Sequence, residues 1–372
     1  ARAFDRFLAA FELYPGDEQS QADVERAAQV TGRWEDLVVA YRAAIAAAEA
    51  AGDAATVTAL RLRLGRVLVD EVGRIDDALV EYRTVHEAEP DNAAALEALE
   101  KLYRQTERWD ALLEVYGRKR ALAGDAIERK PILYAIARLQ VEQLGRIDAA
   151  IETYCAALEE DPADGVALAA LDDLYFRSAA WEQYADVLQR RVDLDVDEGK
   201  LVDLKFRLAA VQNEHLGDPA AALANYREIL FLNQDHEGAR LALEAMLEHP
   251  ELGPEAASIL EAIYEAREDW ERLVGVLEIL ARATPDAERR VALLRKISAT
   301  AAARLGAVDR ALDAQARALQ CDPTLSDARA ELEDLAEQAG AWETVVSIYH
   351  GIASALDDAA LARGYWLRLA AI

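Results

Sequence analysis

The sequence has few of the residues that usually carry chemistry. Among its 372 residues are two cysteines, five histidines and one methionine. Cys155 and Cys321 lie far apart and lack the paired spacing of a metal site or redox motif, so we expect two small buried thiols near the ends of helices. No string matches a zinc-binding, nucleophile-elbow or phosphate-loop motif. We therefore predict no catalytic residue, no cofactor and no metal site, and expect that this chain is not an enzyme.

Long apolar runs and strand-like alternation are also missing. No segment approaches the ~18 uncharged residues of a membrane span. The most apolar stretch, 43–55, is interrupted by Glu49 and Asp53. Alanine and leucine dominate, and the β-branched residues are scattered singly. These absences predict an all-helical protein without a membrane span.

Lysine is scarce, and positive charge is outnumbered. Basic residues total 41, only six of them lysine, against 69 acidic residues, which gives a net charge of −28. Such a chain repels phosphate backbones, which argues against nucleic acid, and it attracts partners of basic character. The alternative is that these evenly spread acids are simply the solvated faces of many helices. Arginine and alanine usage suggests a bacterial source, and unpaired cysteines favour the cytoplasm while leaving the periplasm open.

What the sequence does have is a long internal period. Five tryptophans, each followed at once by an acid, recur at spacings of 75, 72, 89 and 72 residues: Trp34, Trp109, Trp181, Trp270 and Trp342. Four glycines recur at spacings of 72, 72 and 89 residues: Gly73, Gly145, Gly217 and Gly306. A fixed long period indicates stacked repeats, and stacked repeats usually bind other proteins.

Further landmarks follow each glycine at constant offsets. An alanine comes five residues later, and in three copies a tyrosine comes nine residues later: Ala78, Ala150, Ala222, Ala311, Tyr82, Tyr154 and Tyr226. The fourth copy has Gln315 at the tyrosine position. We expect the glycine to follow a helix end, the alanine to let two helices approach, and the tyrosine to fill the gap between units. Each period then holds four amphipathic helices, arranged as two helical hairpins.

These landmarks resemble the tetratricopeptide repeat family. One unit shows the family's order of small and large positions in Leu64-Gly65, Gly73, Ala78, Tyr82 and Pro90. The glycine lies one residue late, so we expect a slightly longer first helix. The resemblance covers nearly the whole chain and implies an all-α, right-handed α-solenoid of about ten repeats and about 20 antiparallel helices. Another α-solenoid, of the half-tetratricopeptide type, is the alternative fold.

The array is interrupted once. The 89-residue spacing holds 17 residues more than its siblings, and the excess lies in 230–253. We predict an extra helix near 239–248, which is either a tolerated insertion at one edge or a break that docks a partner. At both ends the pattern stops inside a repeat. We therefore expect residues 1–372 to be one continuous array, cut from a longer one, with open ends through which copies can self-associate.

The resemblance implies that the first helix of each hairpin lines a groove. Carried across by alignment, it gives these candidate partner-binding residues: Arg66, Asp70, Lys101, Arg104, Tyr134, Arg138, Glu142, Asp173, Phe176, Phe206, Asn213 and Glu214. Arg66 and Arg138 recur at one position, where they are expected to clamp a peptide carboxylate. Tyr134 and Phe206 are expected to seat an apolar side chain. The alternative is that all of these are ordinary surface residues.

The repeated tryptophans have a structural interpretation. Because their spacing follows the repeat, we expect each to bury its ring between units, at a cost of about 3–5 kcal/mol if it is replaced by alanine. The predicted function is a scaffold that binds a protein or peptide along a concave groove. The alternative is a structural spacer or oligomerising rod within a larger assembly.

Overall fold

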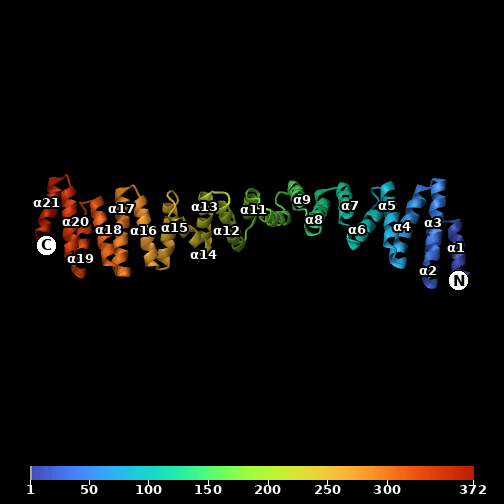
Figure 1. Cartoon of the computed structure of the whole chain (residues 1–372), viewed down its shortest axis with the longest axis horizontal. Helices are drawn as coiled ribbons and strands as arrows, with labels where there is room; N and C mark the ends of the chain where they lie inside the picture. Colours follow the sequence, from blue (N-terminus) through green and yellow to red (C-terminus); the bar gives the residue numbers. More distant parts are fainter. Residues whose placement is uncertain (1) are drawn as a thin grey trace. The chain divides into compact units, whose positions relative to one another are not determined.

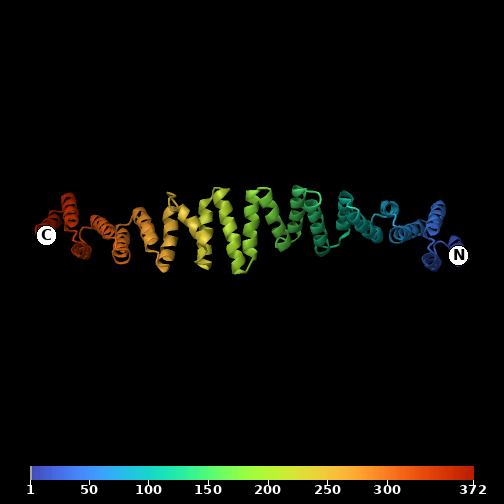
Figure 2. The ribbon, with the colours of Figure 1, turned by 60° about the horizontal axis from the view of Figure 1, so that its bottom comes forward.

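The computed structural model describes residues 2–372, which form α-helices joined by short turns (Figures 1 and 2). Contacts divide the chain into two compact units, residues 1–178 and 179–372, called unit 1 and unit 2 below. Within each unit every helix packs against the next one along the chain. No β-strand occurs in residues 2–372, so the predicted all-α class of helical repeats is confirmed. That one array continues from one unit into the other stays a prediction.

Unit 1 contains ten of the described α-helices and one π-helical turn. Their bounds are α1 Arg2–Leu13, α2 Glu18–Thr31, α3 Trp34–Ala51, α4 Ala54–Val67, the π turn Leu68–Val72, α5 Ile75–Ala88, α6 Ala93–Gln105, α7 Trp109–Leu122, α8 Ala126–Glu142, α9 Ile147–Glu160 and α10 Gly165–Arg177. The hairpins α2–α3, α4–α5, α6–α7 and α8–α9 each have a first and a second helix in this order.

Unit 2 contains the other described α-helices and a second π-helical turn. Their bounds are α11 Trp181–Leu194, α12 Glu198–Glu214, α13 Pro219–Leu232, α14 Glu237–Met246, α15 Gly253–Ala266, α16 Trp270–Ala283, α17 Ala287–Thr300, the π turn Ala301–Leu305, α18 Val308–Cys321, α19 Ser326–Ala339, α20 Trp342–Ala355 and α21 Ala359–Leu369. The first helices of its hairpins are α12, α15, α17 and α19.

The late glycine of the repeat is absorbed by a change of helix type. Residues 68–72 and 301–305 follow α4 and α17 as π-helical turns, which take up one extra residue per turn. Gly73 then ends the first of these turns in the left-handed conformation, at φ 75°, and its N–H donates to the carbonyl of Leu68. The expected longer first helix is therefore confirmed.

The small and large landmark residues pack as expected. Ala78 and its three counterparts are fully buried, and Tyr82 is buried as well. A Cβ atom added to Gly65 would lie 2.6 Å from Cζ of Tyr82, so this site admits the ring only because the residue opposite has no side chain. The repeat is thus built on pairs of small and large residues in contact.

The tryptophans begin their helices but are only half-buried. Trp34, Trp109, Trp181, Trp270 and Trp342 are the first residues of α3, α7, α11, α16 and α20. At the first turn of a helix one part of the ring packs against the core while the rest contributes to the surface. The expectation of full burial is therefore wrong, and the cost of truncation is lower than for a core tryptophan.

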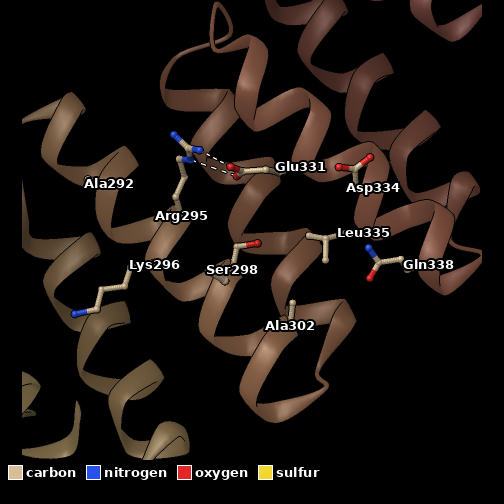
Figure 3. Close-up of a pocket in the computed structure, with 10 residues that line it drawn as sticks. Ala292, Arg295, Lys296, Ser298, Ala302, Glu331, Asp334, Leu335 and Gln338 are labelled. Atoms are coloured by element: carbon tan, nitrogen blue, oxygen red, sulfur yellow. Dashed lines mark hydrogen bonds and ion pairs between the residues drawn. The ribbon is translucent and has the colours of Figure 1, made fainter. Parts of the chain in front are cut away.

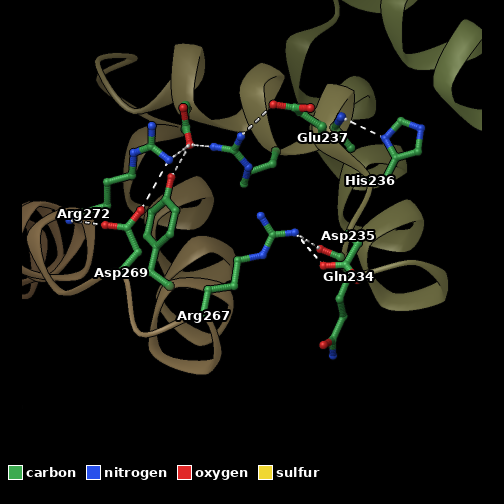
Figure 4. A network of polar contacts seen from close by, with 11 residues as sticks. Gln234, Asp235, His236, Glu237, Arg267, Asp269 and Arg272 are labelled. Atoms are coloured by element: carbon green, nitrogen blue, oxygen red, sulfur yellow. Dashed lines mark hydrogen bonds and ion pairs between the residues drawn. The ribbon is translucent and has the colours of Figure 1, made fainter.

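The predicted extra helix is present as α14. Its Leu243 and Met246 are buried in the core of unit 2. Glu244 accepts a hydrogen bond from the hydroxyl of Tyr264 at 2.5 Å and forms an ion pair with Arg240. Both contacts belong to the polar network drawn in Figure 4. On the same side, Arg267 donates to Asp235 at 2.8 Å. The inserted helix is thus part of the packed core of its unit.

The cysteines differ from the expectation. Both are free and half-buried instead of buried, and Cys155 lies near the middle of α9 rather than at its end. Its sulfur is 3.5 Å from the hydroxyl of Tyr175. In residues 2–372 no three or more His, Cys, Asp or Glu side chains gather as a metal site would need. No helix in the same residues combines the length and apolarity required to cross a membrane.

Candidate partner-binding groove

Two equivalent cavities open on the first helices of unit 1. The cavity between α2, α3 and α4 has a volume of about 290 Å³, and the cavity between α6, α7 and α8 has about 340 Å³. Each has a tryptophan in its wall, so we name them the Trp34 cavity and the Trp109 cavity. They lie one repeat period apart in the sequence, because Arg66 of the first corresponds to Arg138 of the second.

The Trp109 cavity brings together two exposed arginines. The side chain of Arg104 is 62% exposed and that of Arg138 is 69% exposed. Arg104 donates from one nitrogen to the hydroxyl of Tyr116 at 2.5 Å and to Glu100 at 2.9 Å, and Arg138 lies 3.5 Å from Glu142. A guanidinium carries five N–H donors, so both arginines keep donors for an outside group. Burial raises the pKa of Tyr116 above its ordinary value, against the opposing effect of Arg104, and keeps this hydroxyl neutral.

The charged residues that line the Trp34 cavity are mostly acidic: Glu25, Asp70 and Glu71 lie there with Arg26 and Arg66. Arg66 is held by Glu25, at 2.5 Å, and Glu25 also accepts a hydrogen bond from Tyr41 at 2.6 Å. Asp70 and Glu71 line the same cavity and pair with no cation in residues 2–372. Arg66 is thus engaged within the protein and surrounded by acids. Arg66 and Arg138 lie at equivalent positions of the two cavities, as their recurrence in the sequence implies, and a carboxylate contact by either arginine stays a prediction.

Lys101 lies in the middle of α6. It is exposed, and together with Glu97 and Arg104 it lines a shallow hollow of about 450 Å³. This hollow shares Arg104 with the Trp109 cavity. The structure therefore brings four sequence candidates to one stretch of the surface of α6 and α8: Lys101, Arg104, Arg138 and Glu142.

Tyr134 and Phe206 are packed against side chains of their own units. The hydroxyl of Tyr134 donates to Asp164, and its ring centre lies 6.3 Å from that of Tyr154. The ring of Phe206 lies 5.0 Å from that of His236. Both are half-buried, so the structure gives each of them a packing role where the sequence suggested a seat for a partner's apolar side chain.

The remaining candidates lie on exposed helix ends. Asp173 pairs with Arg177 at 3.1 Å, and Phe176 beside them is 56% exposed. Asn213 and Glu214 are exposed at the end of α12. Glu214 contributes, after burial, to raising the pKa of Tyr226 to about 12. None of these four lies in the two tryptophan cavities of unit 1.

In unit 2 the equivalent tryptophans are covered by the chain itself. The imidazole of His215 stacks on Trp181 with ring centres 3.8 Å apart and 6° between the planes. The guanidinium of Arg304 lies 4.8 Å from the centre of the Trp270 ring. His215 and Arg304 correspond in the repeat to Glu71 of the Trp34 cavity and to Gln143 of the Trp109 cavity. One variable position thus places a side chain over the tryptophan ring in these two copies.

The sequence reasoning missed a cavity in unit 2. It lies between α17 and α19, has a volume of about 570 Å³, and is lined by Arg295, Ala299, Ala302, Glu331, Asp334 and Leu335 among others (Figure 3). The signal was available, because the fourth copy of the repeat departs from the others at Gln315. Gln315 lies in the copy of the repeat that contains this cavity.

The comparisons with known proteins concern the fold. No family model and no curated relative matches the chain. Solved structures that are similar include YrrB, described as a TPR protein with an unusual peptide-binding site, at 15% identity over 50% of this chain and 91% of that one, with a TM-score of 0.29. A Naa15/Naa10 complex bound to HypK-THB matches at 14% identity over 99% of this chain and 63% of that one, with a TM-score of 0.41.

A third similar structure is the C-terminal part of a TPR repeat-containing protein from Cytophaga hutchinsonii. It matches at 12% identity over 73% of this chain and 99% of that one, with a TM-score of 0.30. The fold class of this chain rests on its own helical hairpins, its π turns and its paired small and large residues.

Proposed function

Because this chain is built from helical hairpins of the tetratricopeptide type, we propose that it is a non-enzymatic protein-interaction scaffold. Its first helices in unit 1 hold an extended segment of a partner protein, which is centred on the Trp109 cavity. The observation that supports this proposal is that Arg104 and Arg138 line the same cavity as Trp109. The proposal moves the carboxylate site suggested by the sequence from Arg66 to Arg104.

The chemistry of the Trp109 cavity fits a carboxylate. Two guanidinium groups offer fixed donors to one anionic group, and hydrogen bonds between arginine and a carboxylate are stronger than neutral ones. The indole of Trp109 and the side chain of Leu112 form an apolar wall against which the aliphatic part of the bound residue can pack. The ligand is therefore an acidic side chain or a chain terminus. The net charge of −28 favours partners whose flanking residues are basic.

A cross-linking experiment tests this position. A photoreactive benzoylphenylalanine replaces Lys101, which is exposed beside the cavity, and the 372-residue chain is irradiated in lysate of its source cells. The partner captured there is compared with capture from the same residue placed at Arg83, which is exposed on the second helix α5. We expect a partner that cross-links from position 101 and not from position 83.

Charge reversal then assigns the contact to the arginines. Arg104→Glu with Arg138→Glu is expected to abolish the cross-link, since it replaces two donors with two anions. The matched control, Arg83→Glu with Arg120→Glu, makes the same change in net charge on exposed second-helix positions and is expected to keep it. Equal loss in both variants would show a general charge effect and overturn the proposed site. Self-association without a partner would favour the structural spacer.

A further inference from the structure

The fourth copy of the repeat lacks the tyrosine that fills the other three. Tyr82, Tyr154 and Tyr226 are buried at this position. Gln315, which replaces them in α18, is fully buried, and its amide donates to the carbonyl of Ala328 at 3.0 Å and to Glu331 at 2.8 Å. Its own amide oxygen is buried without a hydrogen-bond partner. The shorter, polar side chain of Gln315 therefore occupies the position that a tyrosine ring takes in the other copies.

Neighbouring positions have become small in the same copy. Where the first and second copies have an arginine and a valine, the fourth has alanines: Arg66 and Arg138 correspond to Ala299, and Val69 and Val141 to Ala302. The acid at the tip of the tyrosine has gone as well, since Asp70, Glu142 and Glu214 correspond to Ala303. Four large side chains of the first copy are thus reduced at one place.

The cavity between α17 and α19 lies beside these changes: Ala299 and Ala302 line it, and Gln315 is buried behind Glu331, to which it donates. Figure 3 shows Ala302, Ser298 and Leu335 along its floor and the Arg295–Glu331 ion pair at one end. Arg295 is engaged by Glu331, and Lys296 is held by Glu261 and Glu265, both at 2.8 Å. Asp334 on the opposite wall pairs with no cation or donor in residues 2–372. The cavity therefore combines a floor of small and apolar side chains, in which the Ser298 hydroxyl is bonded to the carbonyl of Ala311, with one available carboxylate.

We propose that the α17–α19 cavity binds a tyrosine side chain from a partner protein. The ring lies against Ala299, Ala302 and Leu335, next to the position where Gln315 replaces the tyrosine of the other copies. The hydroxyl donates to Asp334. This inference rests on the proposed scaffold function and names the residue that unit 2 recognises.

The protein pairs its own tyrosines with carboxylates in the same way. Tyr41 donates to Glu25 at 2.6 Å and Tyr349 to Glu333 at 2.9 Å, each from a second helix to the first helix before it. An aromatic ring with a donor at its tip suits a site that is apolar below and acidic at the rim. Phenylalanine would satisfy only the floor, so the inferred preference is for tyrosine.

The test uses a probe that needs no partner protein. The 372-residue chain is titrated with N-acetyl-3-fluorotyrosinamide, and the fluorine NMR signal of the probe is followed. We expect saturable broadening of this signal, and a weaker response from N-acetyl-4-fluorophenylalaninamide, which lacks the hydroxyl. Because no partner is present, failure here leaves the Arg104–Arg138 test unaffected, and the two proposals fail separately.

Two variants fill the cavity from opposite sides. Gln315→Tyr restores the tyrosine of the other copies, and Ala299→Arg with Ala302→Val restores their surface side chains; each should weaken probe binding by roughly tenfold or more. Ala283→Arg, an exposed position at the end of α16, adds the same charge elsewhere and should leave binding unchanged. If Gln315→Tyr does not fold, the surface variant decides. Wild-type protein without a saturable response, or binding that survives in the filled variants, overturns the proposal.

Discussion

The two units share one repeat pattern, but the surfaces formed by their first helices have cavities at different positions of the repeat. In unit 1 the Trp34 and Trp109 rings line cavities, and the tyrosine site between first helices is filled by Tyr82 and Tyr154. In unit 2 the guanidinium of Arg304 lies over the indole of Trp270, and the copy with Gln315 in place of the tyrosine has a cavity beside it, between α17 and α19. Both surfaces are hollow next to positions that vary between copies of the repeat.

This difference is possible because the packing of each hairpin does not depend on its groove side. Ala78 and Ala311 are both fully buried although their copies differ at the tyrosine position. In a repeat array each unit is stabilised mainly by its own core and its nearest neighbours. A groove residue can therefore change in one copy without affecting the rest, and the predictions below exploit this independence.

The largest expected effect comes from removing the filling tyrosine. Tyr82→Ala should lower the free energy of unfolding of unit 1 by about 3–5 kcal/mol, because it leaves a cavity in a packed core. Gln315→Ala in unit 2 should cost only about 1–2 kcal/mol, since it removes hydrogen bonds next to an existing cavity. Urea unfolding monitored by hydrogen exchange, with peptides of unit 1 and unit 2 followed separately, measures the loss of stability in each variant. Equal costs would mean that Gln315 fills its site as fully as the tyrosine does.

The next largest expected effect comes from Gly65, which lies against the ring of Tyr82. Gly65→Ala should cost about 1–3 kcal/mol, because the new methyl group collides with the ring of Tyr82. Ser298→Ala, at the corresponding position of unit 2, should cost about 1 kcal/mol through its lost hydrogen bond to the carbonyl of Ala311. Thermal unfolding of both variants measures the difference. Since the second copy has Ala137 at this position, a neutral Gly65→Ala would show that the Tyr82 ring can shift as its counterpart does.

Alkaline pH should affect the copies with a tyrosine more than the copy without one. Burial and the charge of Asp70 raise the pKa of Tyr82 from 10.0 to about 12. The stabilisation that the neutral hydroxyl gives the folded state is complete below the unfolded pKa of 10.0 and is lost as the pH rises toward about 12, at a cost of about 2 kcal/mol. Tyr82→Phe should remove this part of the pH dependence of urea midpoints. An unchanged pH profile in Tyr82→Phe would contradict the assignment to this hydroxyl.

The smallest effect separates the covered tryptophan from the open one. Arg304→Gln removes a cation over the Trp270 ring and should cost about 0.5–1 kcal/mol. Hydroxyl-radical footprinting should show faster oxidation of Trp270 in this variant. The corresponding change in unit 1, Glu71→Gln, should leave both stability and the oxidation of Trp34 unchanged. Faster oxidation of Trp34 in the second variant would mean that Glu71 covers its ring.

Much of the fold could be read from the sequence because packing residues repeat. The periods of tryptophan, glycine, alanine and tyrosine placed the helix starts, the helix ends and the inserted helix α14. They did not place the tryptophan rings, which are half-buried, because spacing reports that a residue recurs but not how much of it is covered. Cys155 was misplaced for a similar reason, since one side chain carries no periodic signal.

The candidate site was less predictable. The alignment selected Arg104, Arg138 and Glu142, which line one cavity, but it could not show that Arg66, at the position equivalent to Arg138, is bonded to Glu25 in another cavity. It also selected Tyr134 and Phe206, whose rings contact side chains of their own units. Equivalent positions in a repeat share a place on the helix, whereas partners depend on the neighbouring helix, which alignment does not show.

The sequence by itself determined the helical repeat, its period, its insertion and the chain's strong negative charge, because each is a property of residue order or composition. Only the tertiary structure decided which charges pair, which rings are covered and where the surface is hollow. These features depend on contacts between side chains of successive helices. Gln315 joins the two levels: the sequence marks it as the exception, and the packing of α17 against α19 shows the cavity that accompanies it.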